Sequence, residues 1–282
     1  MAQFIAWQTA EAKRRKGESV IGEIQLTRCE FFGPSKFFYS MSKAERFQLH
    51  EELLKQNEAP HAFLIEVPAN SESPAHFHRV PQYQVFVQGG GQLGRNHTLE
   101  PVTFHYTDEF TGYGPILAAT DGLSYFTLRN YFDPGAEYVN QPGVREKLRL
   151  SGRRYLVVGP DKIQPSRTDA LAARRDTAWE NVIEPHEDGV ATYVLRAGPG
   201  LAFTGPDPST GGGQYWLVLK GSAVYQGVEY IRYSLAWVSC TEAAVTMTAG
   251  SAGVEIAVLQ FPRTLTSRSS QAHAAQKLLG DQ

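Results

Sequence analysis

The 282-residue sequence predicts an all-β protein of two domains with a few peripheral helices. The chain is longer than most single domains and suits two domains of about 120 to 140 residues each. Tyr, Phe and Trp make up 11% of the residues, and 26 glycines and 16 prolines separate short apolar runs, which is typical of strands joined by turns. A repeated order of segments further indicates that one β domain occurs twice.

Six runs have the length and the β-branched or aromatic content of strands. They are HAFLIEV from His61, QYQVFVQ from Gln82, LSYFTLRNYF from Leu123, ATYVLRA from Ala191, QYWLVLKG from Gln214 and VEIAVLQF from Val254. We expect these runs to supply the sheets of both domains.

Helices are predicted in three places. The strongest pattern covers residues 43–56, because Ser42 can cap the helix and Glu45 completes a capping box. Its apolar face would be formed by Phe47, Leu53 and Leu54. Weaker patterns cover residues 168–179 and 271–279. We expect all three helices to pack across the edges of the sheets.

The internal repeat has an offset of 131 or 132 residues. Three segments recur in the same order: IEVPAN from Ile65 as RAGPGL from Arg196, QYQVFVQGG from Gln82 as QYWLVLKGS from Gln214, and TDGLSYFTLRN from Thr120 as SAGVEIAVLQF from Ser251. The common offset indicates a duplicated domain, and we expect the domains to span residues 1–150 and 151–282. The boundary would fall in the polar stretch between Arg145 and Asn181.

Composition argues against several classes of partner. Lys and Arg total 27 against 29 Asp and Glu, and a net charge of -2 argues against a nucleic-acid partner. No stretch approaches the roughly 18 apolar residues of a membrane span, and the N-terminal order of charge and apolar residues does not match a secretory signal. The two cysteines, Cys29 and Cys240, form no disulfide framework. We therefore expect a cytoplasmic protein that binds neither nucleic acid nor membrane.

The segment SPAHFHRVPQYQVFVQGGG, residues 73–91, carries the candidate chemistry. Successive side chains of a strand point to opposite faces, so His76 and His78 would share one face. Two imidazoles at this spacing can bind one cation with little rearrangement. A turn then leads into a strand on which Gln82, Gln84 and Phe86 would share a face.

This segment resembles the first metal-binding motif of the cupins, G-x5-H-x-H-x3-4-E-x6-G. His76 and His78 match the two histidines, and Gly89 matches the last glycine at the required spacing. Two positions depart from the motif, because Asn70 replaces the first glycine and Gln82 replaces the glutamate. The resemblance implies that the chain is a bicupin, with two small double-sheet β-barrels of the jelly-roll type.

The metal motif occurs once. In the second repeat, Pro208 and Thr210 stand where the histidines would be, so the resemblance implies that only the first barrel binds metal. The ligands are predicted to come from His76, His78 and Gln82, with one divalent transition metal as the cofactor and iron as the first candidate. Hydrogen bonding or a substrate contact is the alternative role for Gln82, whose neutral amide removes one negative charge from the motif.

Cupins normally supply a third histidine from a second motif, and its counterpart here has several candidates. A literal fit of that motif from Gly114 selects Tyr125, whereas the internal repeat selects Gly112 or Tyr113. His105 is the nearest imidazole and is included among the predicted metal ligands.

Four residues are predicted to bind the substrate or ligand: Gln84, Tyr113, Tyr125 and Arg129. Arg129 follows Tyr125 and Thr127 on one face of a strand, and an inward guanidinium needs an anionic partner. That partner is either a carboxylate substrate or a structural Asp or Glu.

Three functions follow from these residues. The resemblance extends to ring-cleaving cupin dioxygenases, which implies a metal-dependent enzyme acting on a small aromatic or enolic acid. Other metals and non-oxidative reactions fit the same residues. The first alternative is a non-catalytic pocket that binds a small acid or sugar. The second is a structural protein, with the barrels pairing in a homodimer through their sheet edges.

Overall fold

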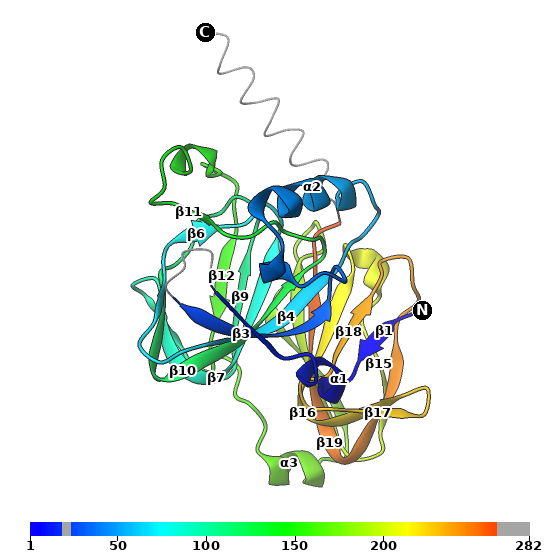
Figure 1. The fold of residues 1–282 in the computed structure, drawn as a ribbon. Helices are drawn as coiled ribbons and strands as arrows, with labels where there is room; N and C mark the ends of the chain where they lie inside the picture. The colour runs from blue at the N-terminus through cyan, green and yellow to red at the C-terminus, as the bar shows by residue number, and fades with distance from the viewer. Residues whose placement is uncertain (19–23, 264–282) are drawn as a thin grey trace.

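The computed structural model describes residues 1–18 and 24–263, and its strands form two β-barrels that lie side by side (Figure 1). Each of the six predicted strand runs overlaps a strand of the structure. The all-β prediction is confirmed. The predicted helix at residues 271–279 lies outside the described residues.

The first barrel is built on one large antiparallel sheet. Its strand order is β12 (Tyr155–Val158), β9 (Thr103–Thr107), β7 (Gln82–Leu93), β10 (Ile116–Arg129), β4 (His61–Val67), β3 (Gln25–Phe32) and β2 (Arg15–Glu18). Two short strands lie off this path, with β5 (Glu72–Ser73) on β10 and β8 (His97–Leu99) on β7. Beside the sheet, β6 (His76–Phe77) pairs with β11 (Glu137–Tyr138).

The second barrel repeats this arrangement. Its strand order is β1 (Gln3–Ile5), β18 (Leu235–Val238), β16 (Gln214–Tyr225), β19 (Thr246–Gln260), β14 (Ala191–Ala197) and β13 (Thr177–Ile183), with β15 (Ala202–Thr204) on β19 and β17 (Val228–Ile231) on β16. The order β9-β7-β10-β4 in the first sheet matches β18-β16-β19-β14 in the second. This shared topology agrees with the duplication inferred from the sequence.

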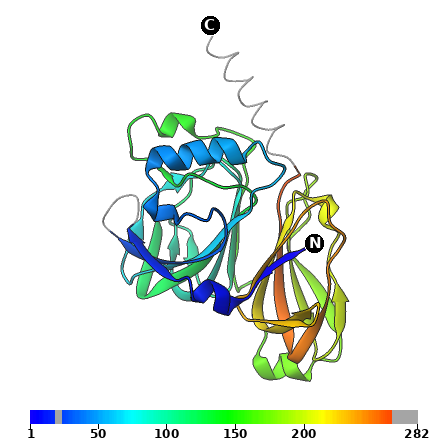
Figure 2. The same cartoon turned by 45° about the vertical axis from the view of Figure 1, so that its right-hand side comes forward.

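The division of the chain differs from the expected boundary at residue 150. Strand β12 follows that boundary, yet it pairs with β9 of the first sheet. Strand β1 starts the chain, yet it crosses to the second barrel and pairs with β18, as the N-terminal segment in Figure 2 shows. The two strands occupy equivalent edges, because β18 is the counterpart of β9. Each barrel therefore completes this edge with a strand from outside the repeated segment.

Three α-helices lie at the periphery of the described chain: α1 (Trp7–Glu11), α2 (Lys43–Leu53) and α3 (Thr168–Ala173). The predicted capping box of α2 is confirmed, since Ser42 accepts from the Glu45 backbone and Glu45 accepts from the Ser42 backbone. The buried residues of α2 are Arg46 and His50, whereas Phe47 is half-buried. Of the predicted apolar face, Leu53 packs against the buried cluster of Phe38, Met41 and Phe132.

The prediction for residues 168–179 is correct only at its start. Helix α3 ends at Ala173, and Trp179 lies in β13, where it pairs with Leu195 of β14. Arg174 follows the helix in an extended conformation, so the chain turns directly into the edge strand. The pairing of this strand with the sheet overrode the helical pattern.

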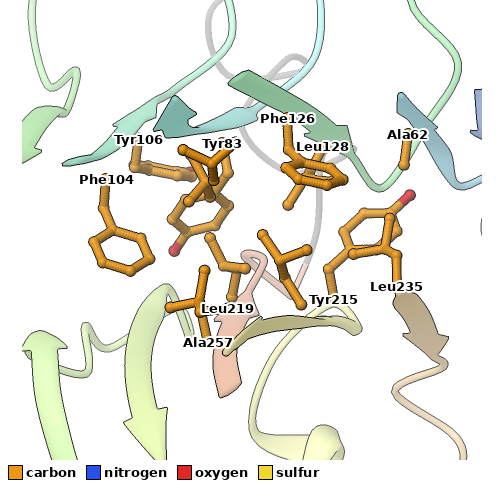
Figure 3. Packing of buried hydrophobic residues seen from close by; sticks show 14 of the residues in the cluster. Ala62, Tyr83, Phe104, Tyr106, Phe126, Leu128, Tyr215, Leu219, Leu235 and Ala257 are labelled. Carbon is orange, nitrogen blue, oxygen red and sulfur yellow. The ribbon is translucent and has the colours of Figure 1, made fainter. Parts of the chain in front are cut away.

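Side chains from both barrels pack into one apolar core between them. On β7, Tyr83, Val85 and Val87 point to this core, while Gln82, Gln84 and Phe86 point into the first barrel, as the strand alternation predicts. Figure 3 shows Tyr83, Phe104 and Phe126 of the first barrel facing Leu219 and Ala257 of the second. The two barrels are thus joined by buried apolar surface, which stabilises their association.

The described residues contain no helix long and apolar enough to cross a membrane. Cys29 is buried, Cys240 is half-buried, and both are free thiols.

A candidate metal and ligand site in the first barrel

A cavity of about 100 Å³ opens inside the first barrel. Seven of the eight residues predicted to bind a metal or substrate line its wall, and the exception is His105. The seven are His76, His78, Gln82, Gln84, Tyr113, Tyr125 and Arg129. The backbones of His76 and Tyr113 form a β-bridge. Tyr113, one of the two positions that the internal repeat offers for the third ligand, therefore lies beside a motif histidine.

Both motif histidines have their ring orientation fixed by an acceptor behind them. Nδ1 of His76 donates to the Pro74 carbonyl oxygen at 2.7 Å, and Nδ1 of His78 donates to Asp133 Oδ1 at 2.7 Å. Since the proton lies on Nδ1 in each ring, Nε2 is unprotonated and carries a lone pair. Both rings face the cavity in the tautomer that a metal ligand requires.

Burial keeps these imidazoles neutral. It lowers the pKa of His76 to about 3, with the neighbouring His78 adding to the shift. Burial also lowers the pKa of His78, and the charge of Arg129 acts in the same direction. Both side chains are therefore available as neutral donors at physiological pH.

Asp133 is a site residue that the sequence did not reveal. It is fully buried and accepts hydrogen bonds from the backbone nitrogens of Arg79 (2.9 Å) and Gly135 (2.8 Å) as well as from His78. Burial alone would raise the pKa of Asp133, but His78, Arg129 and these hydrogen bonds lower it below its usual range. Its Asp-Pro-Gly context signals a turn, and only the tertiary fold brings the carboxylate behind His78.

Arg129, Gln82 and Tyr113 form a directed chain of hydrogen bonds. Arg129 donates from Nε (2.9 Å) and Nη2 (2.6 Å) to Oε1 of Gln82. These donors fix the amide, so that Gln82 Nε2 donates to the Tyr113 hydroxyl at 2.7 Å. The hydroxyl lies 2.9 Å from Nε2 of His76 and donates to it. The chain thus ends on a motif histidine.

The charge of Arg129 has a structural partner. Its side chain is 4% exposed, and Nη1 lies 3.8 Å from Asp133 Oδ1. Nη2 also lies 3.2 Å from Nε2 of His78. Burial lowers the pKa of Arg129, which Asp133 opposes. Of the two partners expected for an inward Arg129, the structure supplies the acidic side chain.

His105 lies behind the cavity wall. Its Nδ1 donates to Gln84 Oε1 at 2.8 Å, and its ring packs 4.9 Å from that of Tyr113. Its Nε2 atom is buried and makes no hydrogen bond within the described part of the chain. The described residues hold no group of three His, Cys, Asp or Glu side chains placed to bind a metal ion. His76, His78 and His105 are therefore not gathered into one three-histidine set.

A second buried arginine, Arg28 on β3, was also missed by sequence reasoning. It is 2% exposed, lines the same cavity, and donates to Nε2 of His61 at 2.9 Å. Its Nε lies 2.7 Å from Glu30, and its guanidinium stacks on the ring of Phe63. No motif contains Arg28, so only the pairing of β3 with β4 shows its position.

Of the side chains predicted to bind the metal, the two motif histidines are suitable ligands and Gln82 is not. The Nε2 atoms of His76 and His78 are unprotonated, and Asp133 supports His78 in the carboxylate–histidine arrangement common at metal sites. Gln82 is not placed as a ligand, because its oxygen accepts from Arg129. Two imidazoles thus fit a transition metal, and a third donor has to come from another side chain.

The corresponding strands of the second barrel hold a different arrangement. Pro208 and Thr210 form a 3-10 turn, and Gln214 Nε2 donates to Gln260 Oε1 at 2.8 Å. Gln214 is the repeat counterpart of Gln82, and Gln260 ends β19 where Arg129 ends β10. An amide pair therefore replaces the arginine–amide pair of the first barrel.

Comparison by sequence finds no matching family model, and no curated protein matches the chain. Comparison by structure finds a provisionally assigned dioxygenase from Nostoc punctiforme, which is 12% identical, with a TM-score of 0.61 over 92% of this chain and 82% of that one. YhhW from Escherichia coli is 14% identical, with a TM-score of 0.53 over 94% and 99% of the two chains.

A third match is the oxalate decarboxylase of Bacillus subtilis, studied for its Mn(II) centres. It is 8% identical, with a TM-score of 0.50 over 93% of this chain and 77% of that one. Together with the strand order of both sheets, these matches show that the chain shares the two-barrel fold of these proteins. At such low identity the likeness concerns the fold, and the function has to be argued from the site itself.

Proposed function

We propose that the first barrel binds one transition-metal ion through His76 and His78 and acts as a dioxygenase on a small aromatic or enolic acid. Iron is the first candidate for the metal. The observation that carries this proposal is the pair of imidazoles whose Nδ1 protons are donated to Pro74 and Asp133, leaving both Nε2 lone pairs on the cavity side. A bound metal ion supplies Lewis-acid polarisation of a coordinated acid.

The cavity wall supports an acidic substrate. Arg28 and Arg129 are both buried there and present positive charge to a volume of about 100 Å³, which suits a small molecule. The rings of Phe63 and Tyr125 add flat apolar surface. In this proposal the arginines attract and orient the carboxylate, and the aromatic wall excludes water from it.

Metal content by plasma mass spectrometry tests the proposal. We expect near one equivalent of a transition metal in the wild-type protein and its loss in the double variant His76→Ala, His78→Ala. Oxygen uptake with small aromatic acids then tests the dioxygenase step. If the wild-type protein contains no metal, even after reconstitution with metal ions, the proposal is wrong.

A non-catalytic ligand-binding pocket is the second candidate. One observation favours it: the hydrogen-bond chain from Arg129 through Gln82 and Tyr113 to His76 is complete without a metal. Such a pocket would retain its small acid after treatment with a chelator, whereas a metal-dependent site would release it. Isothermal titration with and without chelator separates the two candidates.

A further inference from the structure

We infer that the oxygen of Tyr113 is the third metal ligand, bound as phenolate, and that Gln82 acts behind it as a hydrogen-bond donor. This inference rests on the proposed metal site at His76 and His78. It assigns to Tyr113 the position that a histidine holds in the motif, and to Gln82 a role other than ligation.

Tyr113 and His76 lie at the separation expected of two ligands of one metal. The Tyr113 hydroxyl oxygen lies 2.9 Å from Nε2 of His76. Two donors that each lie about 2.1 Å from one metal, at a right angle, are about 3 Å apart. The two atoms are therefore already at the separation of neighbouring ligands. The β-bridge between His76 and Tyr113 and the burial of both side chains hold them there.

The hydrogen bonds of the Gln82 amide run in a fixed direction. Arg129 turns the Gln82 amide so that its nitrogen, and not its oxygen, faces the tyrosine. A charged donor therefore polarises an amide donor that ends on the Tyr113 oxygen at 2.7 Å. Burial raises the pKa of Tyr113, and Arg129 and the hydrogen bond from Gln82 act in the opposite direction, toward the phenolate. A glutamate at position 82 would instead place a carboxylate beside the phenolate.

A phenolate would also balance the charge of the metal site. The glutamine at position 82 removes the negative charge that the motif glutamate brings to the metal, and Arg129 and Asp133 offset one another. A phenolate at Tyr113 restores one negative charge directly on the cation. The two departures from the motif, at the glutamate and at the third histidine, then compensate for each other.

Metal entry would proceed as a ligand exchange without redox change. His76 Nε2 and the Tyr113 oxygen would hold the cation, the hydrogen bond between these two atoms would break, and the phenol proton would leave to solvent. The bond from Gln82 remains and becomes a charge-assisted hydrogen bond to the phenolate.

The test uses ferric ion added to the full-length protein, because an iron(III) phenolate absorbs visible light by charge transfer from ligand to metal. We expect a visible band at one equivalent of iron, its loss in Tyr113→Phe, and its retention in Tyr125→Phe, a matched control in the same cavity. We also expect Tyr113→Phe to bind iron at least about tenfold more weakly.

A second measurement needs no variant and so does not depend on folding of Tyr113→Phe. Zinc is colourless, and its addition to the wild-type protein should produce the ultraviolet difference spectrum of a deprotonated tyrosine, with one proton released per metal. Iron binding without a visible band, or the same band in Tyr113→Phe, would overturn the inference and leave the two-histidine site intact. Absence of any metal binding would overturn the proposed function as well.

Discussion

Tyr215 of the second barrel donates its hydroxyl to the backbone oxygen of Arg129 at 2.8 Å. Tyr83 of the first barrel makes the equivalent contact with the backbone oxygen of Gln260 at 3.1 Å. Tyr83 and Tyr215 are repeat counterparts, and Arg129 and Gln260 end the matching strands β10 and β19. Each barrel thus donates one tyrosine hydroxyl to a backbone oxygen of the other barrel. Through Tyr215, the barrel without the metal motif holds the backbone of Arg129, a residue of the site.

Replacing Tyr215 should weaken both the interface and the site. Tyr215→Phe leaves the buried carbonyl of Arg129 without this donor, and we expect the free energy of unfolding to fall by about 1–2 kcal/mol. Urea denaturation measures this loss. Tyr230→Phe, at a half-buried position of the otherwise exposed strand β17, is the control and should change stability by less than about 0.5 kcal/mol. Equal effects of the two variants would mean that the interface bond contributes nothing.

Asp133 should tune the affinity of His78 for metal. Asp133→Asn removes the charge that holds Nδ1 of His78, so we expect the metal affinity to fall by about 10- to 100-fold. Competition with a chromophoric chelator measures the change. Glu137→Gln provides the control, because Glu137 pairs with Arg79 and Lys147 instead. If both variants bind metal as the wild type does, Asp133 does not support the site.

Acid should destabilise the metal-free protein through its buried imidazoles. Burial lowers the pKa of both His76 and His105 to about 3, against an ordinary value of 6.5. Between these values the unfolded chain binds more protons than the folded one, so stability falls as the pH falls. Each histidine contributes about 1.4 kcal/mol per pH unit in this window.

Denaturation at pH 7 and pH 5, with chelator present, measures that loss. His105→Gln should be less sensitive to pH than the wild type, whatever its stability at pH 7. An unchanged pH dependence in this variant would show that His105 is protonated as readily in the folded protein as in the unfolded chain.

The N-terminal strand should stabilise the second barrel. Phe4 stacks on Tyr225 with ring centroids 4.4 Å apart and lies 4.8 Å from Tyr230. We expect Phe4→Ala to lower the free energy of unfolding by about 2 kcal/mol. Tryptophan fluorescence follows the transition, since Trp216 and Trp237 are buried in that barrel. An unchanged midpoint would mean that β1 is dispensable.

Local pattern was enough to predict the strands and the capping box of α2. Alternation placed Gln82 and Gln84 on the face that lines the cavity, and the spacing of His76 and His78 placed both rings at its wall. These features depend on neighbours within a few residues of sequence, which is the range over which periodicity carries information.

The remaining features depend on contacts between distant segments. Asp133 reaches His78 only because the chain folds back after β10, and Arg28 enters the cavity only because β3 pairs with β4. Trp179 lies in a strand despite the helical pattern of its sequence, because its backbone pairs with that of β14. Such pairings depend on tertiary contacts, which override local preference.

The crossing of β1 has a consequence for synthesis of the protein. Residues 3–5 leave the ribosome about 230 residues before their partner strand at 235–238. At roughly 5 to 20 residues per second, this interval lasts about 10 to 50 seconds. During this interval residues 3–5 lack their partner strand, whereas the first barrel has all of its strands once β12 at residues 155–158 has been made. A segment made early is therefore among the last to pair, and the edge of β18 stays open until it does.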